Sequence, residues 1–569
     1  MADPLKKIRA LQKHASKYRE HIAPVLDGSE TTFPQTPAPR NISSTLTPYS
    51  GPWTERQIAH VLRRTLFGFN KADLKYFGTK TMEQTVNELL TTSPTPPPPI
   101  NNYNSAEIQD PEIPYGETWI NAKFLPDNPD VTASRQISFK LWWTQAMMDQ
   151  KRNIHEKMIL FWHNHLVVQT WDVFIATLTY NYQNTLRQNA LGNFKELVKL
   201  ITLDPAMLIY LNGAANNKTE PDENYGRELQ ELFCIGKGKD SKYTEDDVKA
   251  AARVLTGWSL NPVTLETTFY PFLHESRDKQ FSSFYDNTLI KGRAFNAGKE
   301  ELDDLLDMIF NTNELALFIC RKIYTFFVYS EIDDFTEENV IQPMAEIFRS
   351  NNYEIKPVLD ALFKSEHFFD EMNIGALIKS PIDMVMGFWR SMDIQYPTSL
   401  SIEDIKQYNQ TMYVAPLLLG MELGDPPSVA GWPSYYQIPI FDKAWITSTT
   451  ITFRGQLTDA FTFFGLWRDD QGDPLPMNLL GFTENMDDPG DPNQLIAEAG
   501  ALLLGHPLTD EQKLELKSIL LSGQQADYYW TVAWINYTTD PNEVNKQVVL
   551  SRLLLMYRTL FQLAEFQLM

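Results

Sequence analysis

Apolar residues recur at three- and four-residue steps over most of the chain, which is the spacing of one face of an α-helix. Helices are therefore expected at 134–151, 153–166, 172–189, 192–203, 222–234, 245–257, 299–311, 313–329, 336–350, 356–364, 377–392, 402–423 and 442–465. The alternation typical of strands is scarce, and residues 262–295 lose the helical period, so a small irregular or β insertion is expected there. The pattern predicts a mainly α protein with a large multi-helix globular body.

The pattern also divides the chain into three parts. Residues 1–52 are expected to hold a basic amphipathic helix at 5–22 and a linker rich in Pro, Ser and Thr. Residues 53–467 form the main helical domain. Residues 468–569 begin with an acidic, turn-rich segment, and roughly three helices after it are expected to pack on the main body. No fixed-period repeat is found, which disfavours a solenoid.

Composition narrows the class of protein. The 569 residues, 43% of them hydrophobic, are enough for a large buried core. The formal charge of -22 argues against general nucleic-acid binding, because carboxylates repel the phosphate backbone. No stretch reaches the roughly 18 to 20 apolar residues that a membrane-spanning helix needs.

Cellular location and cysteine state follow from local sequence. The basic N-terminus is followed by neither an apolar core nor a small-residue cleavage site, so no secretory signal is predicted and the chain is expected to be cytoplasmic on its own sequence. Export with a partner, or from a longer precursor, is the alternative. Cys234 and Cys320 are expected to be buried free thiols, with a single bridge between them as the alternative.

Two blocks concentrate polar groups inside apolar, helical sequence: Phe161-Trp162-His163-Asn164-His165 and Pro221-Asp222-Glu223-Asn224-Tyr225-Gly226-Arg227-Glu228-Leu229. Burying such groups costs several kcal/mol each unless they are paired or bound to a metal. The blocks therefore indicate a site.

Helix geometry limits what each block can do. On a regular helix His163 and His165 point about 200 degrees apart, so chelation of one ion by both requires the helix to end or distort. In the second block Glu223 and Arg227 lie at a four-residue step on one face, and Glu228 lies on a neighbouring stripe. An ordinary surface ladder and a functional site are equally compatible with this spacing. No nucleophile elbow, P-loop or dinucleotide fingerprint is present.

The two blocks, together with several others, resemble the bacterial family catalogued as domain of unknown function 1800. The further blocks are Leu191-Gly192-Asn193-Phe194, Asp204-Pro205-Ala206-Met207-Leu208, Tyr243-Thr244-Glu245, Leu255-Thr256-Gly257-Trp258, Lys379-Ser380-Pro381 and Pro426-Pro427-Ser428-Val429-Ala430-Gly431-Trp432-Pro433. The resemblance extends from about Trp53 to Arg454 or beyond. It implies no established reaction. Because members are often encoded beside a secreted, sulfatase-like family, it implies a partner protein of that kind and an envelope or extracellular role.

The leading hypothesis is an enzyme that carries out metal-assisted hydrolysis or another modification of an envelope or extracellular polymer. Its polar centre would be His163, His165, Glu223, Arg227 and Glu228. Imidazole and carboxylate together suit a divalent transition metal such as zinc, with His163, His165 and Glu228 as ligands and His274 as a further candidate. Arg187 and Arg227 would then hold an anionic substrate. The alternative is a non-catalytic assembly or scaffold protein in which the same residues form a buried network.

Overall fold

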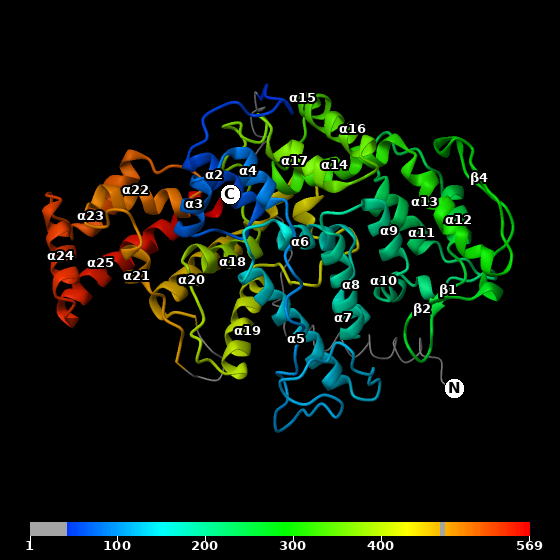
Figure 1. Ribbon diagram of the computed structural model, residues 1–569, viewed down its shortest axis with the longest axis horizontal. Helices are drawn as coiled ribbons and strands as arrows, with labels where there is room; N and C mark the ends of the chain where they lie inside the picture. The colour runs from blue at the N-terminus through cyan, green and yellow to red at the C-terminus, as the bar shows by residue number, and fades with distance from the viewer. Residues whose placement is uncertain (1–41, 467–472) are drawn as a thin grey trace.

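The computed structural model describes residues 42–466 and 473–569. The predicted N-terminal helix at 5–22, most of the linker and the start of the acidic segment lie outside these residues. Helices dominate the described part, and strands are confined to two small antiparallel hairpins, which confirms the mainly α class. Figure 1 shows an elongated molecule with the hairpins at one end, the last five helices at the other and α6 near the middle.

The N-terminal half of the described chain builds the centre and one end of the molecule. Its elements are α2 (Glu55–Thr65), α3 (Lys71–Gly78), α4 (Met82–Leu89), α5 (Pro129–Met148), α6 (His155–His165), α7 (Thr170–Val173), α8 (Ala176–Asn189), α9 (Phe194–Thr202), α10 (Pro205–Tyr210), α11 (Glu223–Glu228), the π-helical turn η2 (Leu229–Cys234) and α12 (Glu245–Val254). Local chemistry sets several of these ends. Asn70, for example, caps α3 by accepting a 2.9 Å hydrogen bond from the Asp73 backbone N–H.

The expected insertion is present as two hairpins. Strand β1 (Trp258–Leu260) pairs with β2 (Thr267–Phe269), and β3 (Lys279–Gln280) pairs with β4 (Leu289–Ile290). Helices then resume with α13 (Glu301–Phe310), α14 (Asn313–Phe327), α15 (Asp334–Thr336), the π-helical turn η6 (Glu337–Ile341), α16 (Gln342–Ser350), α17 (Ile355–Phe363), α18 (Pro381–Ser391), α19 (Ile402–Leu418) and α20 (Ser448–Phe464).

The C-terminal part holds five α-helices where the pattern predicted roughly three. They are α21 (Leu479–Glu484), α22 (Pro492–Leu503), α23 (Asp510–Leu520), α24 (Tyr528–Thr539) and α25 (Glu543–Gln562). Helix α25 packs on α20, and the end of the chain pairs with the segment before α18, where the Met569 N–H donates to the Leu377 carbonyl at 2.9 Å. The C-terminal helices therefore pack directly on the rest of the molecule.

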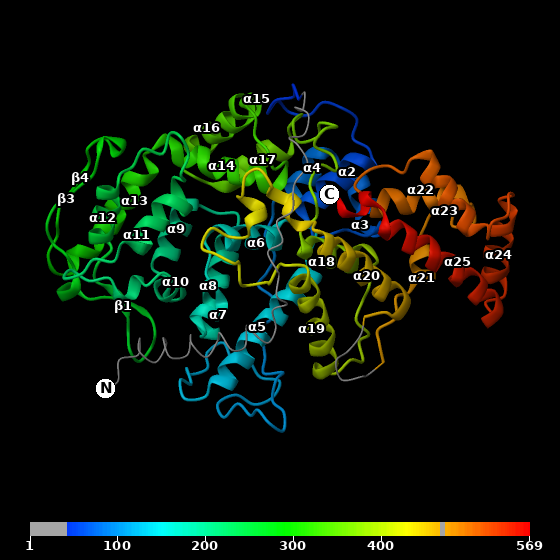
Figure 2. The ribbon, with the colours of Figure 1, turned by 180° about the vertical axis from the view of Figure 1, so that it is seen from behind.

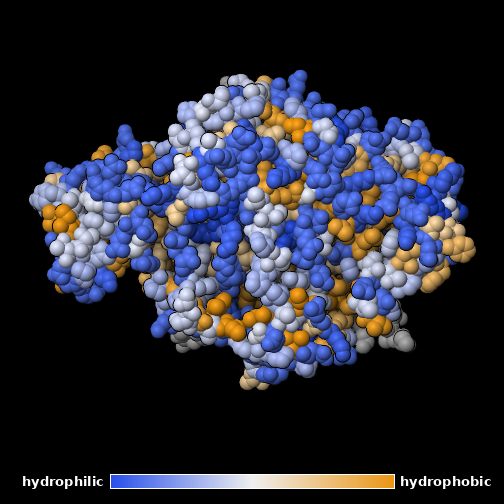
Figure 3. All heavy atoms as spheres, viewed as in Figure 1, coloured by the Kyte–Doolittle hydropathy of each residue, from blue (hydrophilic) through white to orange (hydrophobic). Residues whose placement is uncertain are grey.

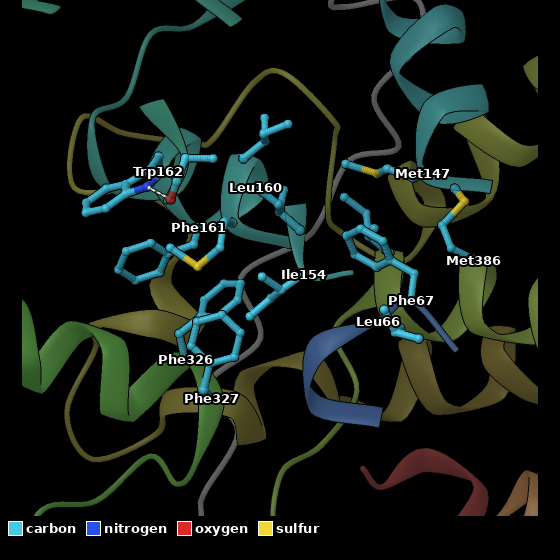
Figure 4. Packing of buried hydrophobic residues seen from close by; sticks show 14 of the residues in the cluster. Leu66, Phe67, Met147, Ile154, Leu160, Phe161, Trp162, Phe326, Phe327 and Met386 are labelled. Atoms are coloured by element: carbon cyan, nitrogen blue, oxygen red, sulfur yellow. Dashed lines mark hydrogen bonds between the residues drawn. The ribbon is translucent and has the colours of Figure 1, made fainter. Parts of the chain in front are cut away.

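A large continuous hydrophobic core runs through the described residues, and Ala133, Trp171 and Phe174 form a second, small cluster. Figure 4 shows its centre, where α6 contributes Phe161 and Trp162, α14 contributes Phe326 and Phe327, and the turn after α2 contributes Phe67. In the part of the chain that the structure covers, no helix combines the length and hydrophobicity needed to cross a membrane. Figure 3 shows a largely hydrophilic face with scattered apolar patches.

Both cysteines are buried free thiols, as expected. Burial raises the pKa of each thiol.

Candidate functional site

Helix α6 remains regular through both histidines, so the two imidazole rings leave it on different sides. His163 is fully buried, and its Nδ1 lies 3.3 Å from the Tyr182 hydroxyl. Its ring packs against Trp143, with the ring centroids 5.1 Å apart. Burial, with the charge of Lys140, lowers the pKa of His163 to about 3, so this ring is neutral in the folded protein. The Nε2 atom of His163 has no hydrogen-bond partner among the described residues.

His165 is held from the opposite side. Its Nε2 lies 2.9 Å from the carbonyl oxygen of Phe233. Because a carbonyl can only accept, Nε2 carries the proton and Nδ1 of the neutral ring keeps a free lone pair. Burial, together with the charge of Lys322, lowers the pKa of His165 to about 3. Within the described chain Nδ1 has no hydrogen-bond partner, and the ring lines a pocket.

The partner of His165 comes from an irregular turn. Helix α11 starts at the cap Asp222, whose side chain accepts a 2.9 Å hydrogen bond from the Asn224 N–H, and then widens into the π-helical turn η2. The carbonyl of Gln230 accepts from the backbone N–H groups of both Ile235 and Gly236, at 2.8 and 3.2 Å. The π-helical turns of proteins are often found at functional sites. Here the turn directs one carbonyl at His165 and brings Glu231 to the same pocket.

This pocket has a volume of about 400 Å³ and lies between α6, η2, α14 and the loop 429–441. Figure 2 shows that loop, in yellow, running beside α6. Aromatic rings form much of the wall, from Phe161, Phe318, Phe326, Tyr435, Tyr436 and Phe441. The ionisable side chains along it are His165, Glu231, Lys237, Glu314, Arg321 and Lys322. We call it the His165–Lys322 pocket.

Most charges in the His165–Lys322 pocket are paired. Arg321 contacts Glu314 and Glu337, each at 2.6 Å, and Lys237 pairs with Glu231. The half-buried Lys322 has neither an ion pair nor a side-chain hydrogen bond in the described part of the chain. Its ammonium lies 5.3 Å from the centroid of the Phe318 ring. Burial without a compensating carboxylate lowers the pKa of Lys322 to about 8.

A family model described as a protein of unknown function, DUF1800, matches residues 60–568. The chain belongs to the DUF1800 family. No curated protein and no solved structure matches it. The resemblance that the sequence blocks indicate is therefore confirmed over nearly the whole chain.

The acidic and basic residues of the second DUF1800 block lie apart from the His165–Lys322 pocket. Arg227 contacts Glu223 at 3.1 Å and Glu245 at 2.7 Å in a surface ladder between α11 and α12. Burial and the neighbouring Glu231 raise the pKa of Glu228, but Glu228 does not line the pocket. Of the five residues proposed as one polar centre, the fold brings only His165 into this pocket.

The proposed zinc ligands do not assemble. Within residues 42–466 and 473–569 no three His, Cys, Asp or Glu side chains are placed to hold a metal ion. His163 and His165 diverge because α6 stays regular, which separates the expected ligands. His274 is held elsewhere, with Nε2 3.1 Å from Glu301. Arg187 forms a buried pair with Glu156 and is not placed to hold a substrate in this pocket.

A buried ionic cluster, which the sequence reasoning missed, anchors the DUF1800 block that contains Gly431. Lys140 of α5 contacts Glu422 at 2.5 Å and Asp425 at 2.7 Å. Asp425 also accepts hydrogen bonds from the Thr170 hydroxyl at 2.6 Å and the Trp171 N–H at 3.0 Å. These bonds fix the start of the loop whose later residues line the His165–Lys322 pocket.

Lys322 was also missed. The sequence feature that could have revealed it is the basic pair Arg321-Lys322 in α14, a helix of mostly apolar residues. A basic pair on a helix ordinarily indicates a solvated face.

Proposed function

We propose that this DUF1800 protein is an enzyme that modifies an envelope or extracellular polymer, with the His165–Lys322 pocket as its active site. One observation carries the proposal. Within the described chain the His165 Nδ1 atom has no hydrogen-bond partner and the Lys322 ammonium has neither a hydrogen-bond partner nor an ionic partner, yet both side chains line one aromatic-walled pocket. Unpaired polar groups of this kind are costly in a folded protein, and they are typical of sites that bind and transform a ligand.

The pocket chemistry suits a ring-bearing substrate. Tyr435 is partly exposed and stacks on the buried Phe326, with the ring centroids 5.0 Å apart, so the Tyr435 ring offers apolar surface to a sugar or aryl ring. The neutral His165 accepts a hydrogen bond at Nδ1, so it orients a substrate hydroxyl or a water molecule. A metal would find His165 Nδ1 as a nitrogen ligand here, but the donor set does not fit a zinc site, so no step is assigned to a metal.

The proposed substrate class, partner and location are suggested by the family resemblance. The polymer substrate, the sulfatase-like partner and the location inside or outside the cell stay predictions. What the pocket itself supports is recognition of a ring and a hydroxyl group by the same cluster of residues.

Two substitutions of His165 separate its two nitrogens. In His165→Gln the amide N–H reaches the position of Nε2 and keeps the bond to the Phe233 carbonyl, but the acceptor at Nδ1 is lost. His165→Asn keeps an acceptor near Nδ1 and loses the donor to Phe233. Leaving that buried carbonyl unpaired costs about 1–3 kcal/mol of stability.

The test is turnover of purified protein on fragments of envelope and extracellular polysaccharides, with products detected by mass spectrometry. We expect conversion by the wild-type protein, a loss of about 100-fold or more in His165→Gln, and a smaller loss with lower stability in His165→Asn. Full activity in His165→Gln would remove His165 from the chemistry. Conversion of no fragment by the wild-type protein would contradict the enzyme proposal.

A scaffold role remains the second candidate, and one observation favours it. Three neighbouring side chains of α6 bind two different segments, α8 with its C-cap Ala190 and the loop 429–441. Trp162 Nε1 donates to the Ala190 carbonyl at 2.9 Å, as Figure 4 shows. His163 meets the Tyr182 hydroxyl, and Asn164 Oδ1 accepts from the Trp432 N–H at 2.9 Å. A scaffold predicts no turnover and unchanged behaviour of His165→Gln in cells.

A further inference from the structure

We propose that Lys322 binds an anionic substituent on the ring of the substrate, so that the His165–Lys322 pocket selects acidic over neutral rings. This inference rests on the proposed function in that it takes the same pocket as the substrate site. It adds the chemical class of the substrate and the residue that recognises it.

The charge pattern of the pocket carries the argument. Each carboxylate of the wall already has a cation: Glu314 contacts Arg321, and Glu231 contacts Lys237. Lys322 is therefore the one pocket cation whose charge no carboxylate of the described chain neutralises. A ligand with one negative charge beside the Lys322 ammonium would neutralise this remaining positive charge.

The surroundings of Lys322 make that charge effective. The side chain is half-buried, and its ammonium lies 5.3 Å from the Phe318 ring centroid, so water solvates it less than it solvates a lysine on the open surface. Its charge also reaches His165, since it contributes to the lowered pKa of that ring. An anionic group at Lys322 and a hydroxyl at His165 Nδ1 are thus recognised within one pocket. A sugar acid carries both groups on a single ring.

An ordinary explanation for Lys322 is a lysine whose stem covers apolar surface while its head stays in water. Lys237 fits that description better, because its side chain is 69% exposed and is paired with Glu231. Lys237 lines the same pocket, so it serves as a matched control.

The experiment is isothermal titration of the full chain with two probes that differ mainly in one carboxylate, phenyl β-D-glucuronide and phenyl β-D-glucoside. Inorganic phosphate is the third probe and tests for binding of a bare anion. The variants are Lys322→Met, which keeps the aliphatic stem, Lys322→Arg, which keeps the charge, and Lys237→Met. Circular dichroism checks that each variant is folded.

We expect the wild-type protein to bind the glucuronide at least about tenfold more tightly than the glucoside, which is the strength of a hydrogen bond to a charged group. The preference disappears in Lys322→Met and persists in Lys322→Arg and Lys237→Met. Equal affinities in the wild-type protein, no binding of the glucuronide, or an undiminished preference in Lys322→Met would overturn the inference. Phosphate binding as tight as that of the glucuronide would overturn the requirement for a ring.

This result is independent of turnover. Lys322-dependent binding without conversion of any polymer fragment would leave the inference standing and remove the enzyme proposal. Conversion of neutral and acidic fragments at equal rates, with no effect of Lys322→Met, would support the enzyme proposal and overturn the inference about Lys322.

Discussion

Replacing Lys322 by methionine is expected to stabilise the folded protein at neutral pH. Burial lowers the pKa of Lys322 from 10.5 to about 8. At 1.36 kcal/mol per pKa unit, this corresponds to an upper limit of about 3 kcal/mol for keeping the charge in the fold. Water reaches the half-buried ammonium and screens it, so we expect a gain of about 1–2 kcal/mol. If Lys322 stabilised the fold, Lys322→Met would instead lower the free energy of unfolding.

The gain depends on pH in a defined direction. In the unfolded chain Lys322 titrates near 10.5, whereas in the folded chain it titrates near 8. Between these values the unfolded state binds more protons, so the stability of the wild-type protein relative to Lys322→Met rises with pH. The advantage of the variant is therefore complete below pH about 8 and absent above about 10.5. Glu231, Lys237, Glu314 and Arg321 line the pocket in both proteins. His165, whose pKa the charge of Lys322 helps to lower, is neutral in both proteins between pH 8 and 10.5.

Thermal unfolding measures the effect. An unfolding entropy of about 2.1 cal/mol/K per residue gives roughly 1.2 kcal/mol/K for 569 residues, so the gain raises Tm by about 1–2 °C. Lys237→Met is the control: the lysine side chain is 69% exposed, but Glu231 is only 12% exposed and loses its cation, so we expect a small fall in Tm rather than a gain. A fall in Tm for Lys322→Met at pH 7, or a gain that is unchanged at pH 10.5, would refute the reasoning.

Three further predictions concern the frame around the pocket. Lys140→Met leaves the buried Asp425 and the partly buried Glu422 without their cation, so we expect a loss of about 3–5 kcal/mol and a Tm about 3–4 °C lower. An unchanged Tm would show that the cluster is not ionised. Gly431→Ala places a side chain on a backbone with φ of 93°, directly beside Asn164, and so strains the loop 429–441. We expect limited proteolysis to cut this loop faster in the variant than in the wild type, and equal rates of cutting would contradict this. The buried Cys234 and Cys320 should react with a thiol reagent only after unfolding, and one equivalent of reaction in native buffer would be inconsistent with the fold.

Much of the helical fold follows from local sequence, because capping and periodicity act within a few residues. The predicted helix at 153–166 corresponds to α6, and the predicted helix at 192–203 corresponds to α9, which Asn193 caps. The predicted helix at 172–189 instead breaks into α7 and α8 at Phe174, which adopts a left-handed backbone with φ of 54°. A non-glycine residue in that conformation is stabilised by its tertiary surroundings, so local pattern does not reveal it.

The site was less predictable for a similar reason. Helix geometry already indicated that His163 and His165 diverge on a regular helix, and α6 is regular to its end. The ladder of Glu223 and Arg227 turned out to lie on the surface, which spacing alone left open. Lys322 lines the pocket together with residues of η2 and the loop 429–441, which contact α14 from about 100 residues away in the sequence, and no local pattern encodes such a contact.

The most direct test of the central claim is a crystal structure of the wild-type protein with phenyl β-D-glucuronide bound. We predict that the ligand lies in the His165–Lys322 pocket, with its carboxylate within hydrogen-bond distance of the Lys322 ammonium and a hydroxyl donating to His165 Nδ1. A ligand bound elsewhere, or a carboxylate of the protein itself occupying the position beside Lys322, would contradict it.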